Sequence, residues 1–499
     1  MKTGRSPSWA WGVLAALASG GLMSACYWPL NLHFLAWIAL VPWLIVLPRL
    51  RPDRAWLFGT LVGLVFYRAG LAWLCTLSGP LGVAAVIGLA LWMGFSFRVA
   101  RLLMDRLSGA AMMWIVPLAF VGQEVVRCEG LAHYRFAYLA WGYSQSHNIW
   151  IAQIASIGGV YFVSFLLVAF NAAVAHELIH RRVRSWLPMV GIATVTILLG
   201  FISQPAGSPS GRQVTVACVQ AETTVYDEYL QLATEATNYP DKPAFVVLPE
   251  HAIYDYADER HPTIRALAEL ARDKGVYICI GVHTRAEAGA ACDYDNVALL
   301  IDTQGHIVGR QAKSVPVPFF DDGNPARSQE TVETPWGRTG TYICYDATFT
   351  DLPRRLVDLG AELLLAPLMD PEPWPVQQRW QHADIAPVRS IELRRCAVRA
   401  ASSGVSQIID ATGHVRRQRT REQGPGVICG PVEFCAGRTP FVRGGHLFAT
   451  AVGAAFLLAV IGLTLADWWG KVRRRRGGPR SSDAVVADDP TATSADADS

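Results

Sequence analysis

Eight long apolar segments, separated by short polar stretches, constrain this chain more than any other feature of its sequence. Seven of them lie within the first 203 residues and one lies near the C-terminal end: residues 9–26, 31–48, 55–77, 80–98, 109–126, 149–175, 185–203 and 445–468. A helix needs about 20 apolar residues to cross the hydrocarbon core of a bilayer. Hydrophobic residues make up 52% of the 499 residues, which is more than an ordinary soluble protein contains. The sequence therefore predicts an integral membrane protein with about eight transmembrane helices.

Basic residues gather in every second connection between these segments. They occur at the N-terminus and after the second, fourth, sixth and eighth segments: Lys2, Arg5, Arg49, Arg51, Arg54, Arg98, Arg101, Arg106, Arg181, Arg182, Arg184, Lys471 and residues 473–476. Because basic loops remain on the cytoplasmic side of a membrane, this pattern predicts that both termini are cytoplasmic. Seven crossings then place residues 204–444 outside the cytoplasmic membrane, which is the periplasmic side of the inner membrane in a bacterium.

The first apolar segment has a second interpretation. Met23-Ser24-Ala25-Cys26 resembles the cleavage site of a lipoprotein signal peptide, which would be removed from the mature protein. Removal of this segment would break the alternation of basic and non-basic connections, so a retained helix is the favoured interpretation.

Composition divides the chain into four predicted parts. They are a seven-helix membrane domain (1–203), a soluble domain (211–440), an eighth transmembrane helix (445–468) and a cytoplasmic tail (471–499). The tail beyond Arg480 is rich in Ser, Asp, Ala and Thr, which predicts disorder. The net charge of +3 gives no reason to expect a nucleic-acid partner. The ten cysteines include no C-x-x-C pair, so zinc-ribbon and thioredoxin-type sites have no support.

The soluble domain alternates predicted strands with predicted helices, which indicates an α/β fold. Three of its segments, 247–250, 313–319 and 341–346, place Glu250, Lys313 and Cys344 where a strand ends or an extended segment turns. Ligand sites of α/β folds are found at such positions. A carboxylate can take the proton of a thiol, the thiolate is a strong nucleophile, and a fixed ammonium can stabilise an oxyanion. Taken singly, each of these residues is equally compatible with a structural or surface role.

The order of these three residues, each within its local sequence, resembles the nitrilase or carbon–nitrogen hydrolase superfamily. The frame of seven helices before the soluble domain and one after it resembles, more narrowly, the bacterial apolipoprotein N-acyltransferase family. Residues 141–145 and 156–161 are similar to that family's segment at the sixth helix. The resemblance implies an αββα sandwich in which Glu250 is the general base, Lys313 the oxyanion-stabilising cation and Cys344 the acyl-accepting nucleophile.

The same resemblance implies the reaction and its partners. Cys344 would take an acyl chain from a membrane phospholipid as a thioester. It would then pass the chain to the N-terminal amine of a diacylglyceryl-modified cysteine on a lipoprotein. Both substrates lie in the membrane, so a site tethered beside the outer leaflet suits them, and the chemistry requires neither a metal nor an organic cofactor.

Five further positions are expected to surround the three central residues. The family has a glutamate eight residues after its lysine, and Asp321 stands there with a side chain one methylene shorter, after Phe320 in place of the family's glycine. The family's Cys-Tyr-Glu triplet corresponds to Cys344 followed by Tyr345 and Asp346. Two more positions are Asn296, which precedes an apolar strand, and Tyr226, which lies in a segment that would match a lipid-facing lid. The residues expected to support the three central residues or to position the substrate are therefore Asp321, Tyr345, Asp346, Asn296 and Tyr226.

Three other functions remain as alternatives. A membrane-tethered amidase or nitrilase-type hydrolase would use the same three residues, with water as the second nucleophile. A non-catalytic lipoprotein-binding relative is disfavoured by the intact set of Glu250, Lys313 and Cys344. An intramembrane metalloprotease would use His176, Glu177 and His180, which match the H-E-x-x-H zinc pattern. These residues lie beside basic residues at a helix end with no third ligand in sight, so a polar helix terminus is favoured.

Overall fold

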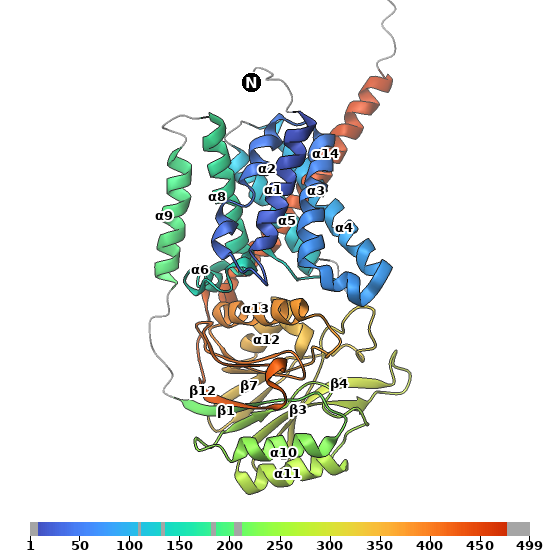
Figure 1. Ribbon diagram of the computed structural model, residues 1–499, viewed down its shortest axis with the longest axis vertical. Helices are drawn as coiled ribbons and strands as arrows, with labels where there is room; N and C mark the ends of the chain where they lie inside the picture. The colour runs from blue at the N-terminus through green and yellow to red at the C-terminus, as the bar shows by residue number, and fades with distance from the viewer. Residues whose placement is uncertain (1–7, 108–110, 131–134, 181–185, 204–211, 477–499) are drawn as a thin grey trace, which may run out of the picture. The chain divides into compact units, whose positions relative to one another are not determined.

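Helices form the N-terminal part of the chain, as its long apolar segments require. The computed structural model describes residues 8–107, 111–130, 135–180, 186–203 and 212–476. The helices of the N-terminal part are α1 (Trp9–Ala25), α2 (Val41–Val46), α3 (Pro52–Gly70), α4 (Ala72–Met104), α5 (Met112–Glu129), α6 (Ile149–Ala152), α7 (Ala155–Gly158), α8 (Val160–His180) and α9 (Trp186–Ile202). Figure 1 shows these helices gathered at one end of the unit that contains residues 1–456.

Three helical stretches among the described residues are long and apolar enough to span a membrane, compared with the eight predicted. They are Ala72–Met104, Val160–His180 and Phe441–Arg473. The predicted segment 31–48 is broken into two 3₁₀ turns and the six-residue α2. The predicted segment 149–175 is divided at Gly159, whose positive φ of 78° ends one helix before α8 begins. Local glycine and proline breaks therefore shorten helices that hydropathy alone treats as continuous.

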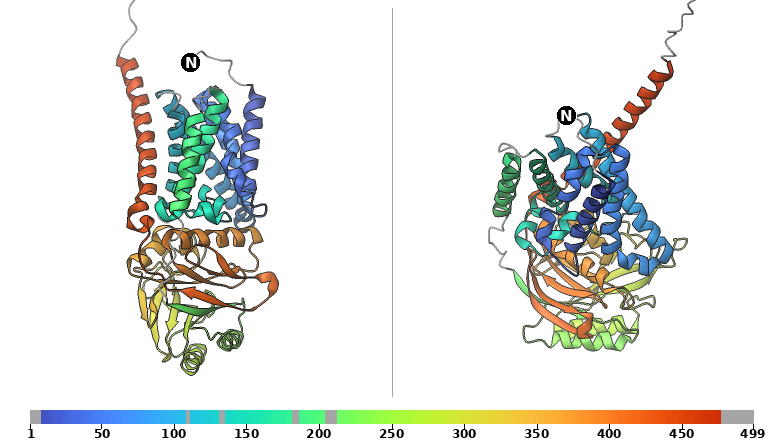
Figure 2. Two further views of the ribbon diagram at one scale, coloured as in Figure 1. Left: turned by 90° about the vertical axis from the view of Figure 1, so that its left-hand side faces the viewer. Right: turned by 45° about the horizontal axis from the view of Figure 1, so that its top comes forward.

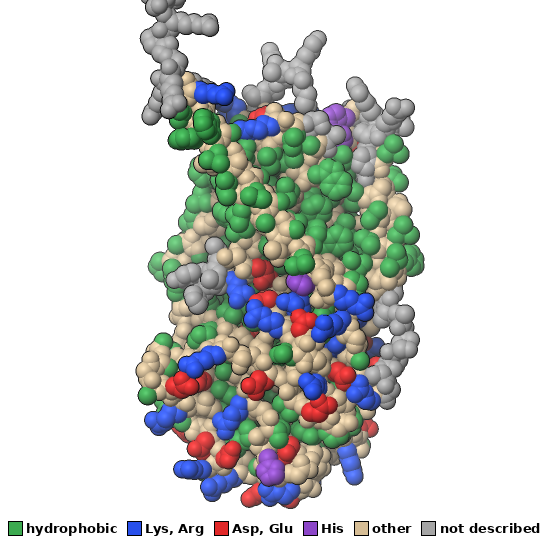
Figure 3. Space-filling view, turned by 180° about the vertical axis from the view of Figure 1, so that it is seen from behind, with side chains coloured by type: hydrophobic (Ala, Val, Ile, Leu, Met, Phe, Trp, Pro, Cys, Tyr) green, Lys and Arg blue, Asp and Glu red, His purple; other side chains and the backbone are tan. Residues whose placement is uncertain are grey.

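The outer surface of these helices is apolar. Large side chains such as Trp9, Leu14, Leu81 and Phe201 are exposed on it. The space-filling view shows hydrophobic side chains over the helical part, whereas charged side chains cover the α/β part (Figure 3). An exposed apolar surface of this extent is typical of contact with lipid, so the structure supports a membrane protein.

The predicted αββα sandwich is confirmed by two six-stranded sheets. One sheet has the order β12-β1-β2-β3-β4-β5 and the other β11-β10-β9-β8-β7-β6. The strands are β1 (Gln213–Gln220), β2 (Phe245–Val247), β3 (Tyr277–Arg285), β4 (Tyr294–Ile301), β5 (Ile307–Ala312), β6 (Thr331–Thr334), β7 (Gly337–Thr341), β8 (Leu363–Leu368), β9 (Cys396–Ala401), β10 (Val405–Ile409), β11 (Val415–Thr420) and β12 (Gly426–Glu433).

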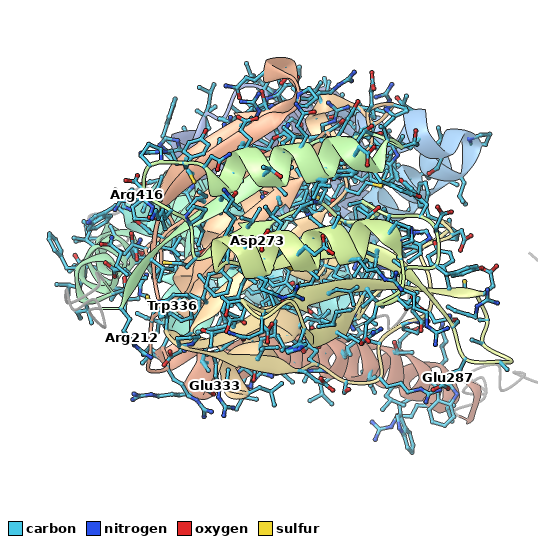
Figure 4. The ribbon with its side chains drawn as sticks, turned by 90° about the horizontal axis from the view of Figure 1, so that it is seen from below. Arg212, Asp273, Glu287, Glu333, Trp336 and Arg416 are labelled. Atoms are coloured by element: carbon cyan, nitrogen blue, oxygen red, sulfur yellow. The ribbon has the colours of Figure 1, made fainter. Side chains whose placement is uncertain are left out.

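Buried side chains from both sheets form the core between them, among them Val216, Phe245, Leu363 and Val398. Helices α10 (Tyr226–Thr237) and α11 (Pro262–Lys274) lie side by side on the outer face of the first sheet, where α11 presents Asp273 to solvent (Figure 4). Helices α12 (Asp351–Asp358) and α13 (Val376–Leu393) belong to the other outer layer. The inner strands β2, β8, β9 and β10 are buried along their whole length, whereas the edge strand β11 is largely exposed.

Helix α13 joins the sandwich to the membrane helices, and it lies between them in both figures (Figures 1 and 2). The indole of Trp73 on α4 donates a hydrogen bond to Gln381 Oε1 at 2.9 Å, and Gln381 Nε2 donates to the Gly70 carbonyl at 2.6 Å. The backbone N–H of Val160, at the start of α8, donates to Glu392 Oε1 at 2.7 Å. Because these groups are buried, the hydrogen bonds fix the register between the two parts. After β12 the chain continues into α14 (Leu447–Arg476).

Candidate active site

Cys344 lies just beyond the end of β7, at the first residue of the 3₁₀ turn Cys344–Thr348. Its backbone is left-handed, with a φ of 47°, which is unusual for a residue with a side chain. The thiol is 7% exposed and donates to the Met369 carbonyl at 3.5 Å. Burial, together with the nearby Glu250 carboxylate, raises the pKa of Cys344 well above its usual value. The resting group is therefore a neutral thiol that needs a base before it can attack.

Glu250 follows β2 and is fully engaged in hydrogen bonds. Its Oε1 accepts from Lys313 Nζ at 2.8 Å and from Asn296 Nδ2 at 2.7 Å, and its Oε2 accepts from the Met369 N–H at 2.8 Å. The residue is 2% exposed. A side chain at Gly281 on β3 would place its Cβ 2.4 Å from the Glu250 Cα, so glycine is required there. Met369 therefore contacts both Glu250 and Cys344 through its backbone.

Lys313 follows β5 and lies between two carboxylates. Its Nζ is 2.8 Å from Glu250 Oε1 and 2.7 Å from Asp322 Oδ2, and the residue is 1% exposed. Burial opposes the charged form, but Glu250 and Asp322 outweigh it and raise the pKa of Lys313 well above its usual value. A permanent cation is thus held beside the thiol, as oxyanion stabilisation requires.

The second carboxylate on Lys313 belongs to Asp322, whereas the sequence comparison had suggested Asp321. Asp322 Oδ1 accepts from Asn296 Nδ2 at 3.0 Å, and its Oδ2 accepts from the Val317 N–H at 2.7 Å. Despite burial, the Lys313 ammonium lowers the pKa of Asp322. Asp321 is exposed and reaches Cys292 Sγ at 3.5 Å. Of the two adjacent aspartates, Asp322 therefore makes the contact with Lys313, and Asp321 does not.

The remaining expected positions divide between supporting contacts and the surface. Asp346 accepts hydrogen bonds from the N–H groups of Ser314, Val315 and Ile343, which ties the Lys313 loop to the Cys344 turn. Burial raises the pKa of Asp346 to about 7.

Asn296 bridges Glu250 and Asp322, as described above, and Tyr345 donates to the Arg135 carbonyl at 2.9 Å. Tyr226 bonds to Asp255 at 3.0 Å and does not line the cavity that contains Cys344.

Two side-chain pairs that contain histidine lie close to the site and were missed by the sequence reasoning: His251 with His283, and His382 with Asp370. His251 Nδ1 lies 2.6 Å from His283 Nε2, and His251 Nε2 lies 3.5 Å from Asp322 Oδ1. On the other side, His382 Nδ1 lies 3.0 Å from Asp370 Oδ1, and His382 Nε2 lies 3.3 Å from the Cys344 carbonyl oxygen. His251 follows Glu250 directly, and that adjacency was the signal available in the sequence.

The described residues contain one cluster of three or more metal-ligand side chains within reach of one another, namely Glu250, His251 and Asp322. The Lys313 ammonium already pairs with both carboxylates of this cluster, so a metal ion would have to displace a buried cation. The rings of His176 and His180 lie 4.1 Å apart between centroids, tilted by 32°, near the end of α8, and within the described residues they belong to no such cluster. The metalloprotease interpretation gains no support.

A cavity of about 610 Å³ opens onto Cys344 and extends along α4. At one end lie Glu250, Lys313, Asp322 and Cys344, which we call the catalytic floor. Along its length lie apolar residues of α4, which we call the apolar wall: Leu74, Leu77, Leu81 and Leu89. Predominantly apolar cavities of this size with a few convergent polar groups are typical of ligand sites.

Two family models match this chain. Residues 19–173 match the apolipoprotein N-acyltransferase N-terminal domain, and residues 215–433 match the carbon–nitrogen hydrolase domain. The apolipoprotein N-acyltransferase of Geobacter metallireducens is 28% identical over 90% of this chain and 94% of its own length. That of Gloeobacter violaceus is 26% identical over the same shares, and that of Pseudomonas syringae pv. tomato is 24% identical over 93% and 97%.

Solved structures similar to part of the chain include Nit3 of Saccharomyces cerevisiae, a member of branch 10 of the nitrilase superfamily. It has a TM-score of 0.39 and 18% identity, and the match covers 45% of this chain and 93% of that one. An amidase from Nesterenkonia sp. has a TM-score of 0.39 and 14% identity, over 48% and 96%. The two matched models, in this order, together with relatives that cover at least 90% of this chain, show that the chain belongs to the apolipoprotein N-acyltransferase family, with a catalytic domain of the carbon–nitrogen hydrolase type.

Proposed function

We propose that this acyltransferase moves an acyl chain from a membrane phospholipid to the N-terminal amine of a diacylglyceryl-modified lipoprotein, through a thioester on Cys344. The observation that carries the proposal is the cavity in which the catalytic floor meets the apolar wall. A buried thiol, base and cation at one end of an apolar cavity suit a substrate that has a carbonyl group at the end of a hydrocarbon chain.

In the first step Glu250 takes the proton of Cys344 as its sulfur attacks the ester carbonyl of the phospholipid. Lys313 faces the negative charge that develops on the carbonyl oxygen. The ester C–O bond then breaks, the proton passes from Glu250 to the departing oxygen, and a lysophospholipid leaves. Asp322 and Asn296 act as positioning residues, because they hold Lys313 and Glu250 in place.

In the second step the amine of the lipoprotein attacks the thioester carbonyl. An amide bond forms, the C–S bond breaks, and the amine proton returns through Glu250 to the sulfur. The apolar surroundings of the thioester keep its local water concentration low, which favours transfer over hydrolysis.

The acyl chain of the donor would lie along the apolar wall. Beyond the break at Gly79, the α-helix rises about 12 Å from Leu81 to Leu89. One leaflet of the hydrocarbon core is about 15 Å thick. The wall is therefore long enough to cover most of an extended acyl chain.

The proposed arrangement in the membrane follows the alternation of basic loops. Residues 1–203 form the seven-helix membrane domain, 211–440 the periplasmic catalytic domain and 445–468 the eighth helix, with both termini in the cytoplasm. The final part of the expected tail, residues 477–499, lies outside the described residues. This placement brings the catalytic floor to the outer leaflet, where both proposed substrates are found.

A transfer assay with an acyl-labelled phospholipid tests the proposal. The purified full chain receives a phospholipid labelled in its acyl chain, followed by a diacylated lipopeptide with a free or a blocked amine. We expect a hydroxylamine-sensitive label on Cys344 that moves to the free amine and stays on the enzyme when the amine is blocked. Label released only as free fatty acid would support the tethered hydrolase, and the absence of a thioester would contradict the role of Cys344.

A further inference from the structure

Two cysteines that do not line the cavity lie on either side of Glu433 in the sandwich. Cys396 is the first residue of β9, and Cys435 lies two residues after β12, in the segment that leads to α14. The two thiols are close enough to influence one another's ionisation. Cys396 is 2% exposed and Cys435 is half-buried.

The backbone around them fixes this approach independently. The Cys435 N–H donates to the Glu362 carbonyl at 3.0 Å, and the next residue, Leu363, pairs with Cys396 across the parallel strands β8 and β9. The Glu433 N–H lies 3.5 Å from Cys396 Sγ, while Cys435 Sγ lies 3.6 Å from the Glu433 carbonyl oxygen. Both sulfur atoms therefore contact the same residue, and ladder hydrogen bonds hold both backbones.

We propose that Cys396 and Cys435 form a disulfide that ties β9 of the second sheet to the segment leading into α14. The inference rests on the periplasmic placement in the proposed function, because disulfides persist in oxidising compartments. The bond would anchor the end of the catalytic domain just before the chain enters α14, where Arg395 already donates to the Gly437 carbonyl at 2.7 Å.

The oxidation balances with a protein disulfide as the electron acceptor. Cys435 is the attacking thiol, because it is half-buried and can be reached, whereas Cys396 is 2% exposed. The Cys435 thiolate attacks the disulfide of this accepting protein, forming a mixed disulfide and releasing one thiol of the accepting protein. Cys396 then loses its proton and attacks Cys435 Sγ. The S–S bond within the chain forms, and the accepting protein leaves as a dithiol that carries both electrons.

Cys218 and Cys429 provide a matched control pair. They lie on the paired strands β1 and β12, but Cys218 is in register with Ile428, and Ala217 is in register with Cys429. Side chains alternate between the two faces of a sheet, so these two thiols point to opposite faces and cannot be bridged.

The test begins with the full chain in its native membrane. Cells are lysed in N-ethylmaleimide, and the protein is digested without reductant and mapped by mass spectrometry. We expect a cross-linked peptide containing Cys396 and Cys435, lighter than its two parts by two hydrogen atoms. Recovery of both cysteines as maleimide adducts would overturn the inference.

A second measurement uses thermal unfolding with and without reductant. The bond closes a loop of about 40 residues, so reduction should lower the unfolding temperature of wild type by about 10 °C. The variant Cys396→Ala/Cys435→Ala should lose this response to reductant, and Cys218→Ala/Cys429→Ala should keep it. An equal response in both variants would contradict the assignment.

Acyl transfer measured on the same preparation separates this inference from the proposed function. Alkylated thiols with intact transfer would reject the disulfide and leave the function standing. A cross-linked peptide without acyl transfer would support the disulfide and contradict the proposed function.

Discussion

The catalytic floor and the apolar wall line one cavity but are held in place by different interactions. The floor is held by directional ion pairs and hydrogen bonds: Lys313 contacts two carboxylates, and Glu250 accepts three hydrogen bonds. The wall consists of apolar side chains on both sides of the break at Gly79 in α4, and its contacts depend on shape alone. Leu81 is 50% exposed. A directional network tolerates little change, so substitutions in the floor should reduce the rate, whereas substitutions in the wall should change which substrates fit.

Among substitutions in the floor, Cys344→Ala should cause the largest loss of activity. It removes the sulfur that carries the acyl group, so we expect no acyl-enzyme and a loss of transfer of at least about 10³-fold. Labelled phospholipid followed by gel fluorography measures both. Cys292→Ala is the control, because that thiol lies near Asp321 rather than in the floor. Activity retained in Cys344→Ala would mean that the floor has another nucleophile.

Lys313→Met should be nearly as severe. It keeps the length of the side chain but leaves Glu250 and Asp322 buried together without their cation. The pKa of one carboxyl group should then rise, since two neighbouring carboxylates resist joint ionisation. We expect kcat/KM for acyl-enzyme formation to fall about 10²–10³-fold. The exposed Lys274→Met provides the comparison, and similar rates in both variants would remove Lys313 from the mechanism.

Asp322→Asn against Asp321→Asn tests which residue of the loop belongs to the floor. Asp322 contacts Lys313, Asn296 and the Val317 N–H, so its substitution should reduce kcat about 10–100-fold with little change in KM. Asp321→Asn should stay within about twofold of wild type, since that side chain is on the surface. The reverse order in steady-state kinetics would restore the spacing suggested by the sequence comparison.

A substitution in the wall should change the preference for acyl-chain length and leave kcat unchanged, unlike a substitution in the floor. Leu77→Trp narrows the cavity, so the preference for long over short acyl chains should fall about tenfold while kcat for short chains is retained. Leu91→Trp on the same helix is the matched control, because Leu91 is exposed and does not line the cavity. Competition between two labelled phospholipids measures the ratio, and an unchanged preference in Leu77→Trp would show that the chain lies elsewhere.

The smallest expected effect concerns stability at the edge of the floor. Burial and the adjacent His251 lower the pKa of His283 to about 4, with Asp293, Asp321 and Asp322 opposing. An unfolded histidine has a pKa of about 6.5, so the unfolded chain gains the proton first as the pH falls. Stability should therefore drop by about 1–2 kcal/mol between pH 6.5 and 4, the ring being partly exposed.

In His283→Gln this part of the pH dependence should disappear from denaturant unfolding curves. An identical slope in the variant would assign the effect to another group.

Local sequence was sufficient to predict the residues at strand ends and insufficient for the loops between them. Glu250 and Lys313 could be predicted together because they follow β2 and β5, two strands of one sheet that end at a common edge. Cys344 follows β7 of the other sheet, and its place beside them was implied by the family resemblance. The loop from Lys313 to Asp322 has no periodicity, so the sequence does not show which of the adjacent Asp321 and Asp322 contacts Lys313. In the membrane part, hydropathy found the apolar segments, but it did not show that Gly159 separates α7 from α8.

The cavity also affects how such a chain can diverge in evolution. The first matched module of the chain ends at residue 173 and the second begins at residue 215, yet Leu77 of the first and Cys344 of the second line the same cavity. A recombinant that received only the catalytic module from a relative would join a native floor to a foreign wall, and would lose the Trp73–Gln381 contact unless both partners were inherited. The two modules are therefore expected to evolve as one heritable unit, with changes along α4 matched by changes on α13.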